Sequence, residues 1–214
     1  MKKIIFLIVC LIGANLSIAH AQDARAGAIL DAMSKKYKAM PSFQAAFTYT
    51  TEGAGVKESM KGDVTVKGTK YRLKLAGKEV FNNGQTVSTY IKETNEVNIT
   101  NYDPNEGGGN IDPTKIYTIY KKGYKYLFIE EQKEGAKVYE VVELTPENKA
   151  AQVKNVRITV DKKDRSVKAW KITDKNGKKT TFRVDKFTPN SNIPDAFFTF
   201  DKTKYPGVEV IDLR

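Results

Sequence analysis

The chain has 214 residues and a formal net charge of +11, from 36 lysines and arginines against 25 aspartates and glutamates. This length suits one sizeable domain and is short for two. The basic excess is spread among acidic residues and is not gathered into clusters with interleaved aromatic residues, which argues against a nucleic acid partner.

The first 21 residues have the three parts of a cleaved export signal in the expected order. Two lysines at 2–3 precede an apolar run over 4–13, and a small-x-small motif at 19–21 offers the cleavage site. The uncharged stretch is short for a membrane span of roughly 20 residues, and the bulky Val9 argues against lipid attachment at Cys10. We therefore expect residues 1–21 to be removed and residues 22–214 to form one exported domain.

Removal of this signal leaves little catalytic chemistry. It discards Cys10 and His20, the only cysteine and histidine of the chain. The exported domain then has no disulfide, no Ser-His-Asp or Cys-His arrangement, and only carboxylates for a metal site. The acidic pairs at 130–131 and 161–164 lie among lysines, and the glycines at 107–109 lack the Lys-Ser/Thr of a phosphate-binding loop. We expect no catalysis, no metal and no cofactor.

Two helices are predicted. The first covers 24–40, with Asp23 as a candidate N-cap, and it ends before Pro41 because the ring removes a backbone donor. A second, shorter helix is predicted after Asp112, where Pro113 suits the first helical position. The apolar residues recur at steps of three and four: Ile29, Met33, Tyr37 and Met40 in the first helix, and Ile116, Ile119 and Tyr120 in the second.

The rest of the chain, apart from an irregular loop over 101–112, has apolar residues at every second position, which is typical of strands with one buried face. About eleven such strands follow one another as consecutive hairpins. The fold class is therefore mainly β (α+β): an incomplete antiparallel β-barrel of about eleven strands, with helices covering a hydrophobic cavity. The expected strands lie at 43–50, 59–67 and 70–75, around 80–81, 87 and 97–99, and at 124–130, 137–144, 153–160, 167–173 and 180–187, with a last segment at 197–200.

A sheet of this size encloses more volume than its own side chains fill. The interior must then hold the amphipathic helices, a hydrophobic ligand, or each in turn. A wide barrel with helical plugs and no catalytic groups is the arrangement of a lipid carrier. For any single inward residue, packing in the core remains the commoner role.

Several short motifs occur in a distinctive order along the mature chain. They are PSFQAAF at 41–47, GDVTVK at 62–67, NGQTVSTY at 83–90, VRITVD at 156–161, a turn at 174–177, FTF at 198–200 and PGVEVI at 206–211. Each motif alone is weak. Their order and spacing resemble the LolA-type family of periplasmic lipoprotein carriers, and the similarity covers nearly all of the mature chain.

This resemblance implies a periplasmic, half-open barrel, closed by helices, that shields lipoprotein acyl chains and carries lipoproteins from the inner to the outer membrane. The implied partners are acylated lipoproteins, an inner-membrane lipoprotein exporter complex and, as a candidate, an outer-membrane acceptor; the carrier itself is expected to be a monomer. Combined with the periodicity, the resemblance assigns the lid to Ile29, Met33, Tyr37, Ile116, Ile119 and Tyr120. The expected lipid-binding residues are Phe47, Tyr49, Val64, Val66, Tyr71, Leu73, Val87, Ile99, Ile158 and Trp170.

One departure from the family concerns the lid. Family members commonly have an arginine followed by proline just after the second strand's lysine, and that arginine is thought to latch the lid. Here Gly68 and Thr69 follow Lys67. Lys70 or Arg72 could substitute, although alternation places both on the polar side of their strand. We therefore expect hydrophobic contact alone to set lid opening.

Other uses of the same barrel stay open. One is an envelope sensor for mislocalised lipoproteins or peptides, although such sensors usually carry an additional C-terminal domain and this chain ends just after its final expected strand. Another is a general lipid-binding protein. An outer-membrane acceptor of the same fold is disfavoured because Cys10 lacks an acylation context.

Overall fold

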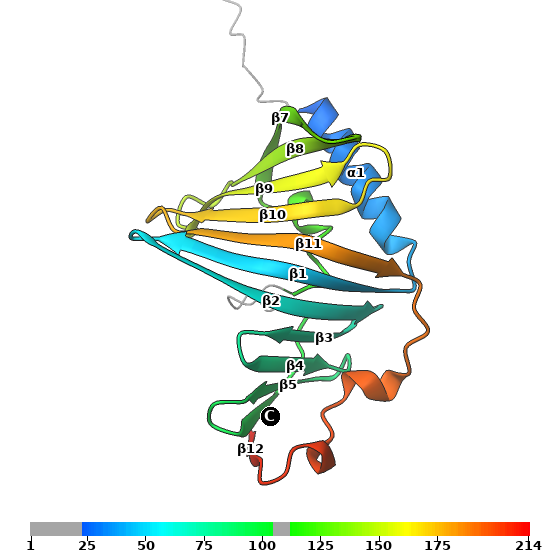
Figure 1. Cartoon of the computed structure of the whole chain (residues 1–214), viewed down its shortest axis with the longest axis vertical. Coiled ribbons are helices and arrows are strands. Elements are labelled where there is room, and N and C mark those ends of the chain that lie inside the picture. The colour runs from blue at the N-terminus through cyan, green and yellow to red at the C-terminus, as the bar shows by residue number, and fades with distance from the viewer. Residues whose placement is uncertain (1–22, 105–111) are drawn as a thin grey trace, which may run out of the picture.

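The structure, a computed structural model, describes residues 23–104 and 112–214 (Figure 1). The expected signal peptide, with Cys10 and His20, lies outside the described residues, and so do the glycines at 107–109. In the described part, the helices are one α-helix, α1 (Ala24–Lys38), and three short 3₁₀-helices, η1 (Ile119–Lys121), η2 (Asp195–Phe198) and η3 (Lys202–Lys204). No helix of that part is long and apolar enough to cross a membrane.

The described residues contain twelve strands. They are β1 (Ser42–Gly53), β2 (Val56–Lys67), β3 (Lys70–Leu75), β4 (Lys78–Asn82), β5 (Thr86–Ile91), β6 (Glu96–Asn101), β7 (Tyr124–Glu134), β8 (Lys137–Pro146), β9 (Val153–Asp161), β10 (Val167–Asp174), β11 (Lys179–Pro189) and β12 (Glu209–Asp212). All of them belong to one sheet in the order β12-β6-β5-β4-β3-β2-β1-β11-β10-β9-β8-β7. Neighbouring strands are antiparallel, except that β12 runs parallel to β6. Because β12 and β7 stand at opposite ends of this order, the sheet is unclosed, which confirms the predicted incomplete barrel.

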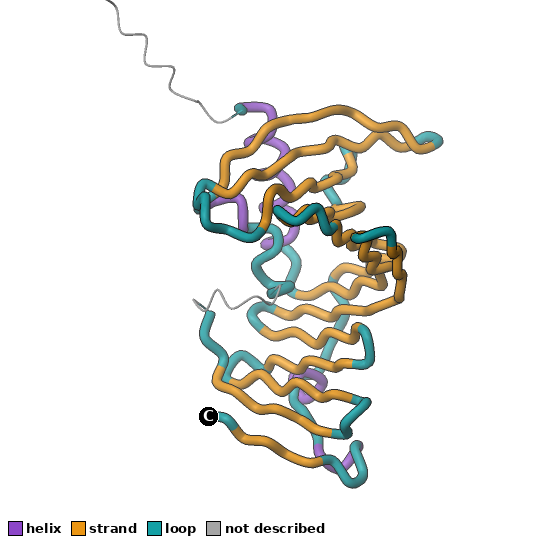
Figure 2. The backbone as a smooth tube through the Cα atoms, turned by 90° about the vertical axis from the view of Figure 1, so that its left-hand side faces the viewer, coloured by secondary structure: helices purple, strands orange, loops and turns teal. Residues whose placement is uncertain are grey.

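Helix α1 forms where the sequence predicts it. The Asp23 carboxylate caps its first turn and accepts hydrogen bonds from the backbone N–H groups of Arg25 (2.8 Å) and Ala26 (3.1 Å). The helix ends at Lys38, three residues before Pro41. The lysines in its last turn stabilise it, because their positive charges lie near the negative end of the helix dipole. In Figures 1 and 2, α1 lies against the strands β7–β10 at one end of the sheet.

The prediction of a second helix after Asp112 is wrong. Residues 113–118 form successive turns, and only the three residues of η1 are helical. The backbone bonds there are of the i→i+3 type, from Lys115 N–H to the Asp112 carbonyl and from Thr118 N–H to the Lys115 carbonyl. A segment this short and rich in β-branched and aromatic residues does not recover the cost of nucleating an α-helix.

The segment 197–200, expected to extend the run of strands, also differs. It begins inside η2, where the Phe197 N–H donates to the carbonyl of Pro194 at 3.0 Å. The alternation of Phe198, Thr199 and Phe200 is that of a strand, but its backbone bonds are local. A later segment, β12, pairs with the sheet instead.

The two faces of the sheet have different coverings. Directly paired residues share a face. Leu73 pairs with Val80, and both pack against the hydrophobic core that contains the apolar side of α1; we name this side the inner face. The next row, in which Arg72 pairs with Phe81, points the other way and belongs to the outer face.

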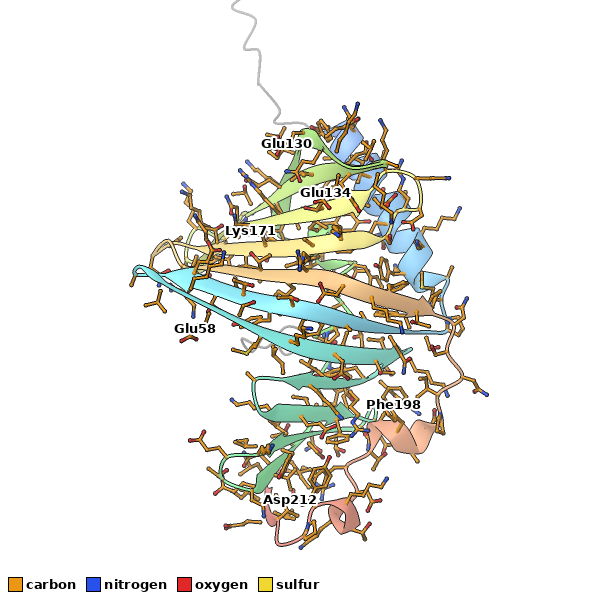
Figure 3. The ribbon with its side chains drawn as sticks, in the orientation of Figure 1. Glu58, Glu130, Glu134, Lys171, Phe198 and Asp212 are labelled. Atoms are coloured by element: carbon orange, nitrogen blue, oxygen red, sulfur yellow. The ribbon has the colours of Figure 1, made fainter. Side chains whose placement is uncertain are left out.

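The C-terminal segment 190–208 covers the outer face of the strands at the β12 end of the sheet. Phe198, labelled in Figure 3, is fully buried there. The Phe81 ring lies 5.7 Å from that of Phe200, and the Tyr90 ring lies 4.5 Å from that of Tyr205. One end of the sheet is therefore covered by α1 on its inner face, and the other end by this segment on its outer face.

Candidate functional site

A cavity of about 470 Å³ lies on the inner face. Its walls come from β1–β5, β10 and β11, and its cover comes from the end of α1 and the turn segment 113–117. Lys78 is the single charged residue in its lining; nearly all the others are aliphatic or aromatic. Such a lining offers an apolar ligand contact over most of its surface.

The structure brings most of the predicted cavity residues together. Those that line the cavity are Phe47, Tyr49, Val64, Tyr71, Leu73, Val87 and Trp170 from the sheet, with Tyr37 and Ile116 from the predicted lid. Their contact with lipid stays a prediction. The lining also contains residues that the sequence reasoning missed, among them Phe43, Ala45, Leu75, Lys78, Val80, Tyr117, Phe182, Val184 and Phe187.

Three predicted lipid-binding residues lie elsewhere. Val66 and Ile158 are on the inner face but are only 2% and 0% exposed, within the packed core. Ile99 pairs with Ser88, whose other partner is Phe81, so Ile99 belongs to the outer face. Alternation shows which residues of a strand share a face, but it does not show which face is inner.

Most of the predicted lid is part of the core. Ile29 and Met33 are 4% and 0% exposed. Tyr120 is also buried, and its hydroxyl donates to the Asp31 carboxylate on α1 at 2.5 Å. Ile119 is 37% exposed and does not line the cavity. The cover that touches the cavity is therefore Tyr37 together with the turn segment 113–117.

Polar contacts fasten α1 to the sheet along its whole length. At its start, the Asp23 carboxylate accepts a hydrogen bond from the Phe128 N–H of β7 at 2.9 Å, and this bond is the main cause that lowers the pKa of Asp23. Two residues on, the Arg25 guanidinium pairs with Glu131 and Glu140. Near its end, the Lys36 ammonium donates to the Asp164 carbonyl at 2.7 Å. These contacts favour α1 as a fixed wall.

Tyr37 closes one end of the cavity. Its ring stacks on that of Tyr117 at 5.6 Å and meets the edges of Phe43 and Phe187 at 5.5 and 5.7 Å. Its hydroxyl accepts a hydrogen bond from the Val167 N–H at 3.0 Å. Burial raises the pKa of Tyr37 to about 12, so this hydroxyl stays neutral in the apolar wall.

A β-bulge shapes the wall where β1 meets β11. Ala46 pairs with Lys186 and Phe47 with Val184, so Asp185 has no direct partner in β1. The extra residue shifts the alternation of β11, and Val184 and Phe187 both line the cavity although they are three positions apart. This shift explains why a strict period of two does not predict Phe187.

Gly62 makes room for Phe47 at the neighbouring position of β2. The two residues pair directly, and the Phe47 ring lies over the glycine. A Cβ atom at Gly62 would stand 2.6 Å from Cζ of Phe47 and 2.8 Å from the carbonyl oxygen of Lys74. The absent side chain therefore sets how far the Phe47 ring projects into the cavity.

Lys70 and Arg72, the candidate replacements for the family's arginine, do not contact α1. Lys67 and Lys70 both donate to the Asp195 carboxylate, at 2.8 and 2.6 Å, and these bonds lower the pKa of Asp195 to about 2. Arg72 pairs with Glu79, its Nε lying 2.6 Å from the carboxylate. All three basic side chains bind carboxylates on the outer face, Asp195 or Glu79. None of them therefore latches the cavity cover.

The acidic pairs of the sequence have partners within the fold, some in the same turn and others on distant elements. Asp161 accepts hydrogen bonds from the backbone N–H groups of Lys163 and Asp164 in the turn before β10. Glu131 pairs with Arg25 and Lys162. In the described ranges, no three His, Cys, Asp or Glu residues are grouped so as to hold a metal ion.

Comparison with solved structures finds several chains that are similar to this one. An uncharacterized conserved protein from Thermus thermophilus is similar over 88% of this chain and 99% of its own, with 13% identity and a TM-score of 0.59. A LolA superfamily protein from Nitrosomonas europaea covers 83% of this chain and 98% of its own, with 13% identity and a TM-score of 0.43. The lipoprotein LppX from Mycobacterium tuberculosis covers 78% and 98%, with 13% identity and a TM-score of 0.46.

No curated protein matches the chain. At the identities of the solved structures, the likeness concerns the fold alone. The family comparison goes further, because the model described as outer membrane lipoprotein carrier protein LolA matches residues 15–178, well over half of the chain. The chain therefore belongs to the family of the outer membrane lipoprotein carrier protein LolA.

Proposed function

We propose that this protein is a periplasmic carrier that shields lipoprotein acyl chains in its cavity and moves lipoproteins from the inner to the outer membrane. The observation that carries the proposal is the cavity of about 470 Å³ with its nearly uncharged lining. The description of the family supports it. The carrier performs no catalysis; an exporter complex in the inner membrane loads it, and an acceptor at the outer membrane receives the cargo.

The energetics of transfer require such a shield. Each methylene that leaves an apolar environment for water costs about 0.8 kcal/mol, so a free acyl chain crosses the periplasm too slowly to be useful. The cavity is about three times the size of the engineered 150 Å³ cavity that binds one benzene molecule, which is room for about one acyl chain. More chains require the cover to move.

The turn segment 113–117 is the part of the cover suited to move. Its backbone hydrogen bonds are short-range. The aromatic contact that joins the segment to α1 is the stack of the Tyr117 ring on the Tyr37 ring. Because α1 is fastened by Asp23, Arg25 and Lys36, opening at 113–117 enlarges the cavity and leaves α1 in place, at the cost of the contacts that Ile116 and Tyr117 make with the core. A carrier has to release its cargo, and a cover that competes with the ligand for the same apolar wall lowers the net affinity.

Binding of a synthetic acylated lipopeptide tests the proposal. Leu73→Glu places a carboxylate in the cavity wall and should lower the affinity at least tenfold, since a buried charge without a partner is costly. Leu127→Glu is the matched control, because Leu127 is 56% exposed on β7 and does not line the cavity. Equal affinity of both variants, with both folded by circular dichroism, would contradict an apolar binding site.

The transport step needs a test in cells. Depletion of the protein should leave outer-membrane lipoproteins in the inner-membrane fraction, and mass spectrometry of the purified periplasmic protein should find an acylated polypeptide bound to it. Unchanged lipoprotein sorting after depletion would remove the transport part of the proposal and leave only lipid binding.

A further inference from the structure

Lys78 stands apart in the cavity lining. It is the single charged residue there, and it is exposed, whereas Tyr37, Phe43 and Tyr71 in the lining are buried. The cavity therefore communicates with solvent on the side of Lys78 and is closed on the side of Tyr37. A lysine at such a place contributes its apolar stem to the wall and keeps its ammonium group in water.

The position of Lys78 on the inner face follows from the register. Phe47 pairs with Gly62, Gly62 with Leu75, and Leu75 with Lys78, so these four residues form one row across β1–β4. Phe47 and Leu75 also line the cavity. The Lys78 side chain thus stands at the end of an apolar row, on the same face as the ring of Phe47.

The ammonium group of Lys78 has no partner among the described residues: no hydrogen bond or ion pair joins it to any of them. The adjacent carboxylate, Glu79, points to the outer face, where Arg72, Lys74 and the Tyr205 hydroxyl engage it. Thr89, which pairs with Val80, places a hydroxyl in the next row of the lining. A positive charge and a hydroxyl beside an apolar cavity form a complementary site for an anion.

We infer that the cavity binds an acyl chain whose head group carries one negative charge, and that Lys78 pairs with this head group at the open end. The inference rests on the proposed function, because it assumes that the cavity holds acyl chains. A single lysine acts as a point charge and matches one negative charge, whereas bidentate recognition of a phosphate needs the planar guanidinium of an arginine, which the cavity lining does not contain among the described residues. From the row of Leu75 to that of Tyr71 the strand advances about 13 Å, which is the length of a medium acyl chain.

Calorimetric titration with dodecanoate and dodecanol tests the head-group site, since the two probes share a chain length and differ in charge. Lys78→Met should weaken dodecanoate binding two- to fivefold at low salt and leave dodecanol binding unchanged. Lys61→Met is the matched control, because Lys61 is exposed on β2, pairs with Thr48 on the outer face and does not line the cavity. It removes the same charge and should change neither affinity.

The outcomes separate this inference from the carrier proposal. Unchanged dodecanoate binding in Lys78→Met, with dodecanol still bound, overturns the head-group site and leaves the apolar cavity intact. An equal loss in Lys61→Met also overturns it, because the attraction is then a general effect of net charge. Failure of wild type to bind dodecanol removes the acyl-chain site itself. Lauroyl lysophosphatidylglycerol, a phosphodiester, completes the series: a larger loss with it than with dodecanoate in Lys78→Met identifies a phospholipid as the source of the head group.

Discussion

The ring of Tyr37 on α1 stacks on that of Tyr117 in the turn segment 113–117, with centroids 5.6 Å apart and planes 13° from parallel. This contact joins a helix that is fastened to the sheet to a segment held by short-range turns. Tyr37 also accepts the Val167 N–H bond, so its ring position is fixed. When the turn segment 113–117 moves away from the cavity, the stack between Tyr117 and Tyr37 is therefore the aromatic contact that has to break.

Replacement of Tyr117 by leucine should make the cover open more readily. Tyr117→Leu keeps an apolar side chain but loses an aromatic pair worth about 0.5–1.5 kcal/mol. We expect dodecanol to dissociate faster in stopped-flow experiments, with a small loss of stability in urea. Tyr90→Leu removes an aromatic contact of the outer face, with Tyr205 at 4.5 Å, and should lower stability without changing dissociation. Equal dissociation rates in both variants would argue against a moving cover.

Substitution of Gly62 should disturb the cavity wall through Phe47. In Gly62→Ala, the new Cβ meets both the Phe47 ring and the Lys74 carbonyl, and only the ring can move away. We expect overpacking that costs about 1–3 kcal/mol in urea unfolding, together with weaker dodecanol binding as the ring enters the cavity.

Gly53→Ala provides the comparison, since its Cβ would stand 3.5 Å from the nearest atom of Lys178, an ordinary contact. A double variant that combines Gly62→Ala with Phe47→Leu tests the cause. Leucine is smaller than phenylalanine, so this variant should recover part of the stability that Gly62→Ala loses. No recovery would place the strain at the Lys74 carbonyl rather than at the ring.

The alternation of apolar residues predicts much of the site, and its failures have identifiable causes. Along β1–β5, period two selects Phe47, Val64 and Leu73, which line the cavity, because each strand is covered on one face by apolar contacts. The same rule groups Ile99 with Val97 but gives no information on which face of the sheet is inner. The turn between β5 and β6 decides that, by pairing Ile99 with Ser88.

Other parts of the site depend on long-range structure. The bulge between β1 and β11 exists only in the paired strands, so Phe187 escapes a prediction made from one segment. Lys78 escapes for a different reason, since a charged residue in an apolar alternation suggests an outward position. The second helix fails because the apolar steps at 116 and 119 are compatible with turns of three residues as well as with a helix.

The ion pairs of Asp195 should make stability depend on pH. Hydrogen bonds from Lys67 and Lys70 lower the pKa of Asp195 to about 2 in the folded protein, whereas an unperturbed aspartate has a pKa of about 3.9. The unfolded chain therefore binds the proton more tightly, and the contribution of Asp195 is present above about pH 4 and is lost as the pH falls toward 2.

The measurement compares wild type with Asp195→Asn by urea unfolding across this range. The difference in stability between the two proteins should be largest near neutral pH and should shrink below pH 4. High salt should reduce it, because Asp195 is an exposed group. A difference that stays constant down to pH 2 would show that the two lysines do not stabilise the charged carboxylate.

The N-cap of α1 offers a test of whether the helix is the fixed wall of the cavity. Asp23→Ala removes the acceptor for Arg25 and Ala26 within the helix and for Phe128 in β7. The loss of the cap costs about 1–2 kcal/mol, and the loss of the Phe128 bond adds to it because that N–H is left without its carboxylate. Asp23→Asn keeps an acceptor oxygen and should retain most of the stability.

If α1 is a fixed wall, hydrogen exchange of the α1 amides should be slow in wild type and in Asp23→Asn, and it should not change when dodecanol binds. Faster exchange of the whole helix on ligand binding would instead identify α1, and not the turn segment 113–117, as the part that moves.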